Sequence, residues 1–341
     1  MIENITFSYG VAKLNAYEYW RRGITGNNVK VGIFDGGISP HLALKPNVSG
    51  FGVNENDTIL DYNVDSTGHG THVAGILAGS HNYPGIYAGI APDVQLYSIK
   101  ILTVPTMRSF LIGLIKGIEW AIDANLDILN MSIDISESLI SRYEEYRQPL
   151  IDAFTNLDNE GILVCVAAGN QNKGEEDNLT TNGFLQKMPG VTVVSSLNRY
   201  DQSSIFTGRG PQVNLAGYGN DIIAPFRDNT VPVSKKMNLL SGTSMATPQI
   251  TGIAALYKEI YPNYNKQELL EAIYQNAKKI EGVANYEQGF GVPQPPNDLY
   301  RFEILKEYNQ QFLRKLYGWE SLNVYLEGSP GYEKYSIGSH R

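Results

Sequence analysis

Short apolar runs alternate with segments of helical spacing along much of this chain. The runs are rich in apolar and β-branched residues, which is typical of strands buried on both faces: Val29–Phe34, Gln95–Leu102, Leu126–Ile133, Ile162–Ala168 and Val191–Ser196. Between them, three segments space their apolar residues along one helical face: Gly70–Gly79, Arg108–Asp123 and Gln148–Asn159. This alternation predicts an α/β fold, a three-layer sandwich with a mostly parallel central sheet.

A serine stands where a further apolar helix begins. Ser244 lies among the small residues of Ser241–Pro248, and the apolar residues that follow are spaced for a buried helix. Glycine and threonine ahead of the serine leave room for a substrate backbone. A serine hydroxyl is a weak nucleophile at neutral pH unless a base takes its proton and a carboxylate orients that base. The position therefore indicates a candidate nucleophile that needs two partners.

Two other positions supply those partners. His69 lies among small residues that open a second apolar helix, and the glycines on either side of it expose its ring. Asp35 ends the apolar run from Val29 and is followed by two glycines. Because open α/β sheets place their sites at the carboxyl ends of strands, we expect Asp35 and His69 to meet there. The resulting chain order is Asp, His, Ser.

The sequences around Asp35, His69 and Ser244 resemble the three signatures of the subtilisin-like serine proteases, or subtilases, which have this order of catalytic residues. The resemblance extends from about residue 10 to about residue 295. It implies a serine endopeptidase that hydrolyses polypeptides through an acyl-enzyme on Ser244. His69 would be the general base and acid, and Asp35 would orient it.

The resemblance also implies an oxyanion hole and a substrate cleft. Asn170 matches the asparagine whose side-chain amide stabilises the oxyanion, with the backbone N–H of Ser244 as the second donor. Two segments are implied to bind substrate, with the residues Ser132, Ile133, Asp134, Ala168 and Gly169. Asp134 departs from the glycine that is usual in the family. It either points to solvent or places a negative charge beside the cleft, where it would favour basic side chains near the cleaved bond.

Each of these residues has an ordinary structural explanation when it is taken alone. An aspartate at a strand end is usually a cap or a turn residue, a serine at a helix start an N-cap, and an asparagine after glycine a turn residue. Together, in one order and with matching neighbours, they favour catalysis. Among the other histidines, we expect His72 to be a structural helix residue. His41, His81 and His340 are expected at the surface or in loops.

The chemistry implied by the resemblance needs no cofactor, and any metal would be structural. Asn82 matches a loop that carries calcium ligands in the family. Ser39–Leu42, however, lacks the acid that the family has after its aspartate. Since calcium takes six to eight oxygen ligands, the missing carboxylate weakens the case for calcium.

The composition and charge of the chain limit the kinds of partner that it can bind. The 341 residues are 42% hydrophobic with a net charge of -8, which argues against nucleic acid. Cys165 is the single cysteine, so no intrachain disulfide forms. The chain shows neither a signal peptide nor an apolar stretch long enough to span a membrane. We therefore expect a cytoplasmic protein; the alternative is a secreted one whose pre-pro segment has been removed. A propeptide or an inhibitor would then be a further partner, and the oligomeric state is unknown.

Residues 1–296 are expected to form the catalytic domain and residues 297–341 a C-terminal helical extension. Apolar residues recur at helical spacing from Leu299 to Leu316. We expect this helix to pack on the catalytic domain, because an exposed apolar stripe is a liability. The alternatives are a dimer contact or a tail that inhibits the active site.

Two functions other than proteolysis fit the sequence less well. A non-catalytic relative used as a binding module is disfavoured because all four chemical positions are intact. An α/β-hydrolase esterase would need a Gly-x-Ser-x-Gly elbow, which is absent around Ser244. Within proteolysis, the choice between intracellular processing and general degradation stays open, because selectivity depends on loops and partners.

Overall fold

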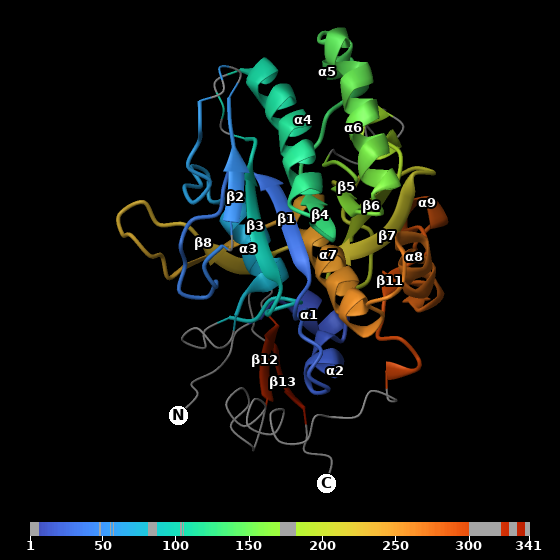
Figure 1. Cartoon of the computed structure of the whole chain (residues 1–341). Coiled ribbons are helices and arrows are strands. Elements are labelled where there is room, and N and C mark those ends of the chain that lie inside the picture. Colours follow the sequence, from blue (N-terminus) through green and yellow to red (C-terminus); the bar gives the residue numbers. More distant parts are fainter. Residues whose placement is uncertain are drawn as a thin grey trace.

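A seven-stranded sheet runs through the centre of the molecule, and each pair of neighbouring strands in it is parallel (Figure 1). The computed structural model describes residues 7–47, 49–54, 56, 58–80, 87–102, 104, 106–170, 182–299, 322–326 and 333–337. Across the sheet the strand order is β2 (Ser49–Gly52), β3 (Gln95–Lys100), β1 (Lys30–Asp35), β4 (Ile128–Met131), β5 (Leu163–Ala167), β6 (Val191–Leu197) and β7 (Val213–Tyr218).

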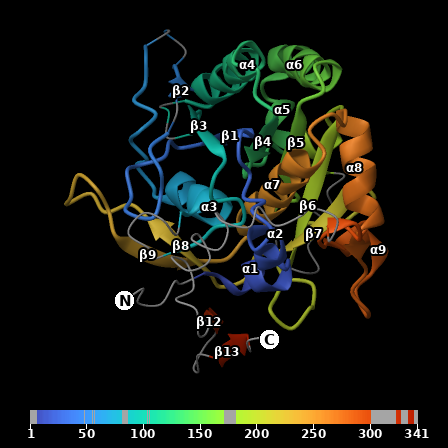
Figure 2. The ribbon, with the colours of Figure 1, turned by 60° about the horizontal axis from the view of Figure 1, so that its bottom comes forward.

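Helices cover both faces of the sheet. Figure 2 shows α4 (Met107–Asp123) and α6 (Arg147–Asn159) on one side, with α3 (His69–Ala78) and α7 (Thr243–Ile260) on the other. The predicted three-layer α/β sandwich is therefore confirmed.

Two large hydrophobic cores, one on each face of the sheet, hold the layers together. On β1, Val31 and Ile33 belong to the core beneath α3 and α7, whereas Phe34 belongs to the core beneath α4 and α6. Side chains alternate between the faces of a strand, so a strand covered on both sides must be apolar at nearly every position. This explains the near-continuous apolar run that ends at Asp35.

Shorter elements surround this framework. An antiparallel hairpin, β8 (Ile222–Phe226) and β9 (Lys236–Leu240), leads into α7. Among the described residues, the other helices and 3-10 helices are α1 (Tyr9–Lys13), α2 (Ala16–Trp20), α5 (Glu137–Ile140), η1 (Glu144–Tyr146), η4 (Leu185–Lys187), α8 (Lys266–Gln275) and α9 (Asn285–Gln288). Two further antiparallel pairs are β10 (Ala277–Lys278) with β11 (Val292–Pro293), and β12 (Leu322–Leu326) with β13 (Glu333–Ile337).

All five predicted strands are present, with bounds that differ by a few residues. The largest difference is at β4, which ends at Met131, so Ser132 and Ile133 lie beyond the strand rather than within it. The sheet also contains β2 and β7, which the apolar pattern did not predict.

The predicted C-terminal helix, apart from Leu299, lies outside the described residues, so the boundary at residue 296 stays a prediction. Leu299 itself is buried in the core beneath α7. Among the helices that the structure describes, none has the length and apolar character needed to cross a membrane.

Candidate active site

Three elements deliver the predicted catalytic residues to one side of the molecule. Asp35 is the last residue of β1, His69 the first of α3 and Ser244 the second of α7. Helix α3 packs against both β1 and α7. Each residue thus lies at the end of a rigid element, which limits how far its side chain can move.

Asp35 and His69 form a direct contact. Nδ1 of His69 lies 2.7 Å from Oδ2 of Asp35, and because a carboxylate only accepts, Nδ1 carries the proton. The Asp35 side chain is 1% exposed, and its Oδ1 accepts the N–H of Gly36 at 2.7 Å. Burial lowers the pKa of His69, but the charge and hydrogen bond of Asp35, together with the charge of Asp65, raise it above its ordinary value. The contact thus fixes the imidazole tautomer and leaves Nε2 as the acceptor.

A buried aspartate that the sequence reasoning missed fixes the start of α3. Asp65 Oδ1 accepts the N–H groups of Thr67 and Gly68, and its Oδ2 accepts the N–H and hydroxyl of Thr71 at 2.8 Å. These bonds satisfy N–H groups that a helix start leaves unpaired. The local signal was an aspartate followed by threonine and glycine just before an apolar helix. Asp65 thus holds the turn from which His69 projects.

Gly70 allows α3 to approach Asp35 closely. A Cβ at this position would lie 2.2 Å from the carbonyl oxygen of Gly37 and 3.0 Å from Oδ1 of Asp35. No other residue type fits without moving the helix. The glycine after His69 is therefore required by the same contact that joins His69 to Asp35.

Ser244 and Ser132 exchange hydrogen bonds. The Ser244 hydroxyl donates to the carbonyl oxygen of Ser132 at 3.3 Å, and the Ser132 hydroxyl donates to the carbonyl oxygen of Ser244 at 2.9 Å. In the part of the chain that the structure describes, no hydrogen bond joins Ser244 to His69. Such bonds are often loose in unliganded sites and tighten when substrate binds. The structure thus brings Asp35 and His69 into contact and packs α3 against α7. It does not show a hydrogen bond between His69 and Ser244.

The side chain of Asn170 is oriented by the residue before Ser244. Its Oδ1 accepts the backbone N–H of Thr243 at 2.7 Å and the Thr243 hydroxyl at 3.0 Å. Both donors fix which end of the amide is oxygen, so Nδ2 is the end left to donate elsewhere. Asn170 itself is exposed.

The predicted substrate segments follow adjacent parallel strands. Ser132 and Ile133 are buried just beyond β4, and Ala168 is buried just beyond β5. Asp134 is exposed, and its Oδ2 lies 3.5 Å from where a Cβ on Gly169 would be. The two segments therefore lie beside each other at the carboxyl edge of the sheet, where α/β proteins form their sites.

Two other histidines fasten the β8–β9 hairpin. Nε2 of His72 donates to the carbonyl oxygens of Ile222 and Asn238, at 3.1 and 3.0 Å. Burial, with a smaller contribution from the charge of His69, lowers the pKa of His72 to about 4, against the effect of those two bonds. His41 lies in a loop, as predicted, but not at the surface: its ring is buried and lies 2.9 Å from the carbonyl oxygen of Lys236.

The calcium site that the family resemblance raised stays a prediction, because its expected ligand Asn82 lies outside the described residues. His81 and His340 lie outside them as well. His41, which stands where the family has an acid, accepts the N–H of Ala43 at Nδ1, so both ring nitrogens bind backbone. Among the described residues, no group of three or more His, Cys, Asp or Glu side chains is arranged to hold a metal ion.

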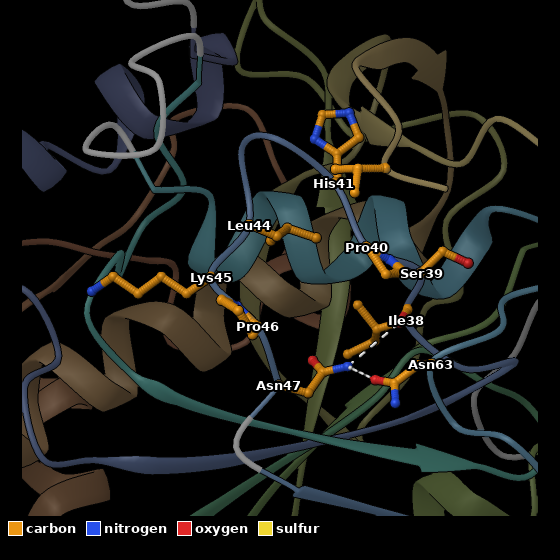
Figure 3. A pocket seen from close by; sticks show the side chains of 10 residues that line it. Ile38, Ser39, Pro40, His41, Leu44, Lys45, Pro46, Asn47 and Asn63 are labelled. Carbon is orange, nitrogen blue, oxygen red and sulfur yellow. Dashed lines mark hydrogen bonds between the residues drawn. The ribbon is translucent and has the colours of Figure 1, made fainter. Parts of the chain in front are cut away.

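A pocket lies beside the loop that follows Asp35 (Figure 3). It is lined by part of Ile38–Asn47 together with Asn63 and Val233. Within the pocket lining, Nδ2 of Asn47 donates to Oδ1 of Asn63 at 3.0 Å and to the carbonyl oxygen of Ile38 at 3.4 Å. None of the four predicted chemical residues Asp35, His69, Asn170 and Ser244 lines this pocket, so it is separate from the candidate active site.

Known proteins resemble this chain over most of its length. The model of the subtilase family matches residues 26–291. The thermostable alkaline protease of Halalkalibacterium halodurans is 33% identical over 284 residues, which are 83% of this chain and 72% of that protein. Subtilisin DY of Bacillus licheniformis is 31% identical over 285 residues, covering 83% of this chain and 96% of its own.

Solved structures share the fold. The MycP3 protease of the type VII (ESX-3) secretion system superposes with a TM-score of 0.66 at 23% identity, covering 85% of this chain and 87% of its own. A protease of Pseudoalteromonas arctica gives a TM-score of 0.69 at 22% identity, covering 85% and 94%.

Proposed function

The chain belongs to the subtilase family and is a serine endopeptidase, and we propose that Ser244, His69 and Asp35 carry its chemistry. The observation that carries this assignment is the 2.7 Å contact between His69 Nδ1 and the buried carboxylate of Asp35. It leaves His69 Nε2 as a base, on a helix packed against the helix that bears Ser244.

The first half of the reaction forms an acyl-enzyme. Oγ of Ser244 attacks the scissile carbonyl carbon while Nε2 of His69 takes the hydroxyl proton, giving an imidazolium paired with Asp35. The tetrahedral intermediate collapses when His69 passes that proton to the leaving amine nitrogen and the C–N bond breaks. The raised pKa of His69 supports this step, because it means that the surroundings favour the protonated ring.

The oxyanion is stabilised by two donors that are in position before the reaction. One is Nδ2 of Asn170, whose amide is oriented by Thr243. The other is the backbone N–H of Ser244, which lies in the first turn of α7 and so has no acceptor within the helix. Preorganised donors of this kind supply much of the rate enhancement in acyl transfer.

Deacylation repeats the sequence with water. His69 removes a proton from the water that attacks the acyl carbonyl, and returns it to Oγ of Ser244. Nucleophile, base and oxyanion donors are all supplied by the chain, so we propose that the chemistry needs no metal or cofactor. The predicted cytoplasmic location stays a prediction. Intracellular processing and general proteolysis differ in the range of peptides cleaved: a processing enzyme would cleave few sequences and a degradative one many.

Hydrolysis of a fluorogenic peptide mixture by the full chain tests the assignment. We expect Ser244→Ala and His69→Ala each to lower kcat by roughly 10⁶, the size found in subtilisin, and the double variant to be no slower than either. Such non-additivity arises only when two residues act in one step. A double variant that is slower by the product of both factors would mean that they act separately, and activity retained in Ser244→Ala would refute the assignment.

A further inference from the structure

Asp134 belongs to the segment that follows β4 and faces the segment that follows β5. Its Oδ2 is 3.5 Å from the position that a Cβ on Gly169 would take, so the carboxylate reaches across to the opposite segment. On its own segment, Ser132 exchanges hydrogen bonds with Ser244, and on the other, Asn170 follows Gly169. The carboxylate thus stands between residues that neighbour the reacting serine and the oxyanion donor.

A buried glutamine holds this carboxylate in place. Nε2 of Gln186, in η4, donates to Oδ1 of Asp134 at 3.0 Å and to the carbonyl oxygen of Ala167 at 2.7 Å. Gln186 is 3% exposed, and its Oε1 has no hydrogen-bond partner within the described residues. An unpaired buried carbonyl is unfavourable, and turning the amide round would set its oxygen against two acceptors. The side chain is therefore oriented to serve Asp134 and Ala167.

In the part of the chain that the structure describes, no basic side chain neutralises the charge of Asp134. Gln186, its one hydrogen-bond partner there, is uncharged. Other acids nearby in the sequence are paired: Glu137 contacts both Arg147 and Lys187. An exposed acid is usually only a solvated surface charge. Asp134 differs from that case, because Gln186 holds its carboxylate between the two predicted substrate segments and no cation among the described residues pairs with it.

We infer that Asp134 selects substrates with lysine or arginine at the residue before the cleaved bond. This inference rests on the proposed function, since it concerns the cleft beside Ser244. Oδ2 has no hydrogen bond among the described residues, so it can accept one from the ammonium or guanidinium group of a substrate side chain that lies beside it. Gly169, with φ +98°, has no side chain to fill the space between the two segments.

Matched peptides that differ only at the residue before the cleaved bond test the inference. With the full chain at low ionic strength, we expect kcat/KM for Arg and Lys to exceed that for Leu, Phe and Gln by at least about tenfold. Asp134→Asn should abolish that preference, because it should slow cleavage of the basic peptides far more than cleavage of the Leu peptide. Asp134→Lys should favour Glu instead. Added salt should weaken the wild-type preference.

Asp152→Asn is the matched control. Asp152 is also exposed and also accepts from a glutamine amide, Nε2 of Gln148 at 2.8 Å, but it lies on α6. Its removal should leave the preference unchanged, and thermal unfolding should show that all variants are folded.

The possible failures are distinguishable. Equal cleavage after Arg and Leu, or a preference that survives in Asp134→Asn, would overturn the inference while leaving the endopeptidase assignment intact. No hydrolysis of any peptide by folded wild-type protein would remove both.

Discussion

The hydroxyl of Ser132 donates to the carbonyl oxygen of Ser244 at 2.9 Å, where a helix would normally supply an N–H. The residue four positions after Ser244 is Pro248, which lies within α7 and has no N–H to give. Ser132, just beyond β4, satisfies the carbonyl that the proline leaves unpaired. In turn its oxygen accepts from Nδ2 of Asn130 at 3.0 Å, and Asn130 Oδ1 accepts from Thr251 of α7. The serine-bearing turn is thus tied to the sheet.

Replacing Ser132 tests that tie. Ser132→Ala should lower the free energy of unfolding by about 1–3 kcal/mol, because it leaves the Ser244 carbonyl and the Asn130 amide without a partner. In a Pro248→Ala background the same change should be milder, since an alanine N–H can reach the Ser244 carbonyl. Urea unfolding of the four proteins, all carrying Ser244→Ala to prevent autolysis, gives the coupling. Equal losses in both backgrounds would contradict this explanation.

Asn170 should act on the rate more than on binding. We expect Asn170→Ala to lower kcat by about 10²–10³, the size known for the equivalent donor in subtilisin, with KM nearly unchanged. Thr243→Val removes one of the two bonds that orient the amide and should lower kcat by a smaller factor. Thr243→Ser keeps the hydroxyl and is the control. Steady-state kinetics on one peptide tests this, and a KM effect without a kcat effect would argue against oxyanion stabilisation.

On acidification, the activity should be lost with a midpoint above the ordinary pKa of histidine. His69 must be neutral to accept the serine proton, and its pKa is raised, so kcat/KM should be lost as the pH falls through a midpoint above 6.5. Asp35→Asn removes the charge that raises the pKa of His69, while burial still lowers it. The midpoint should therefore move to lower pH, and the rate should be much lower. Asp152→Asn removes a distant charge and should leave the midpoint unchanged. A wild-type midpoint below 6.5 would contradict the assignment of the base.

Stability should decline in acid because of His72. Its pKa is about 4 in the folded chain against 6.5 ordinarily, so between these values only the unfolded chain binds the proton. The free energy of unfolding therefore falls as the pH drops from 6.5 to 4, by about 3 kcal/mol from this group. His72→Gln should flatten that part of the profile. Urea unfolding of Ser244→Ala at several pH values measures it, and an identical slope with and without His72 would refute the explanation.

The framework of the site could be predicted because its residues lie at boundaries of strong local patterns. Asp35 ends a strand that is apolar on both faces, and Ser244 lies in the first turn of a helix that is buried along most of its length. Strand β2 was missed because Ser49–Gly52 holds two glycines and one large apolar residue, too weak a pattern to distinguish from a loop.

The connections within the site could not be predicted, because they join distant positions. Ser132 and Ser244 are 112 residues apart, and Gln186 is 52 residues from Asp134. No local periodicity encodes such pairs. Asp65, by contrast, is close to His69 in the sequence. The residues around it indicate a cap at the start of the helix.

Covalent labelling of the serine tests the central assignment most directly. The full chain would be treated with a fluorophosphonate probe, and intact mass and peptide mapping would be compared for wild type, Ser244→Ala and Ser241→Ala. Ser241 is the control because it lies in the same small-residue segment, where its hydroxyl oxygen accepts the backbone N–H of Asp221. We expect one adduct, on Ser244, in wild type and in Ser241→Ala, and none in Ser244→Ala. Labelling that persists in Ser244→Ala, or a folded wild type that takes no label, would contradict the assignment of Ser244 as the nucleophile.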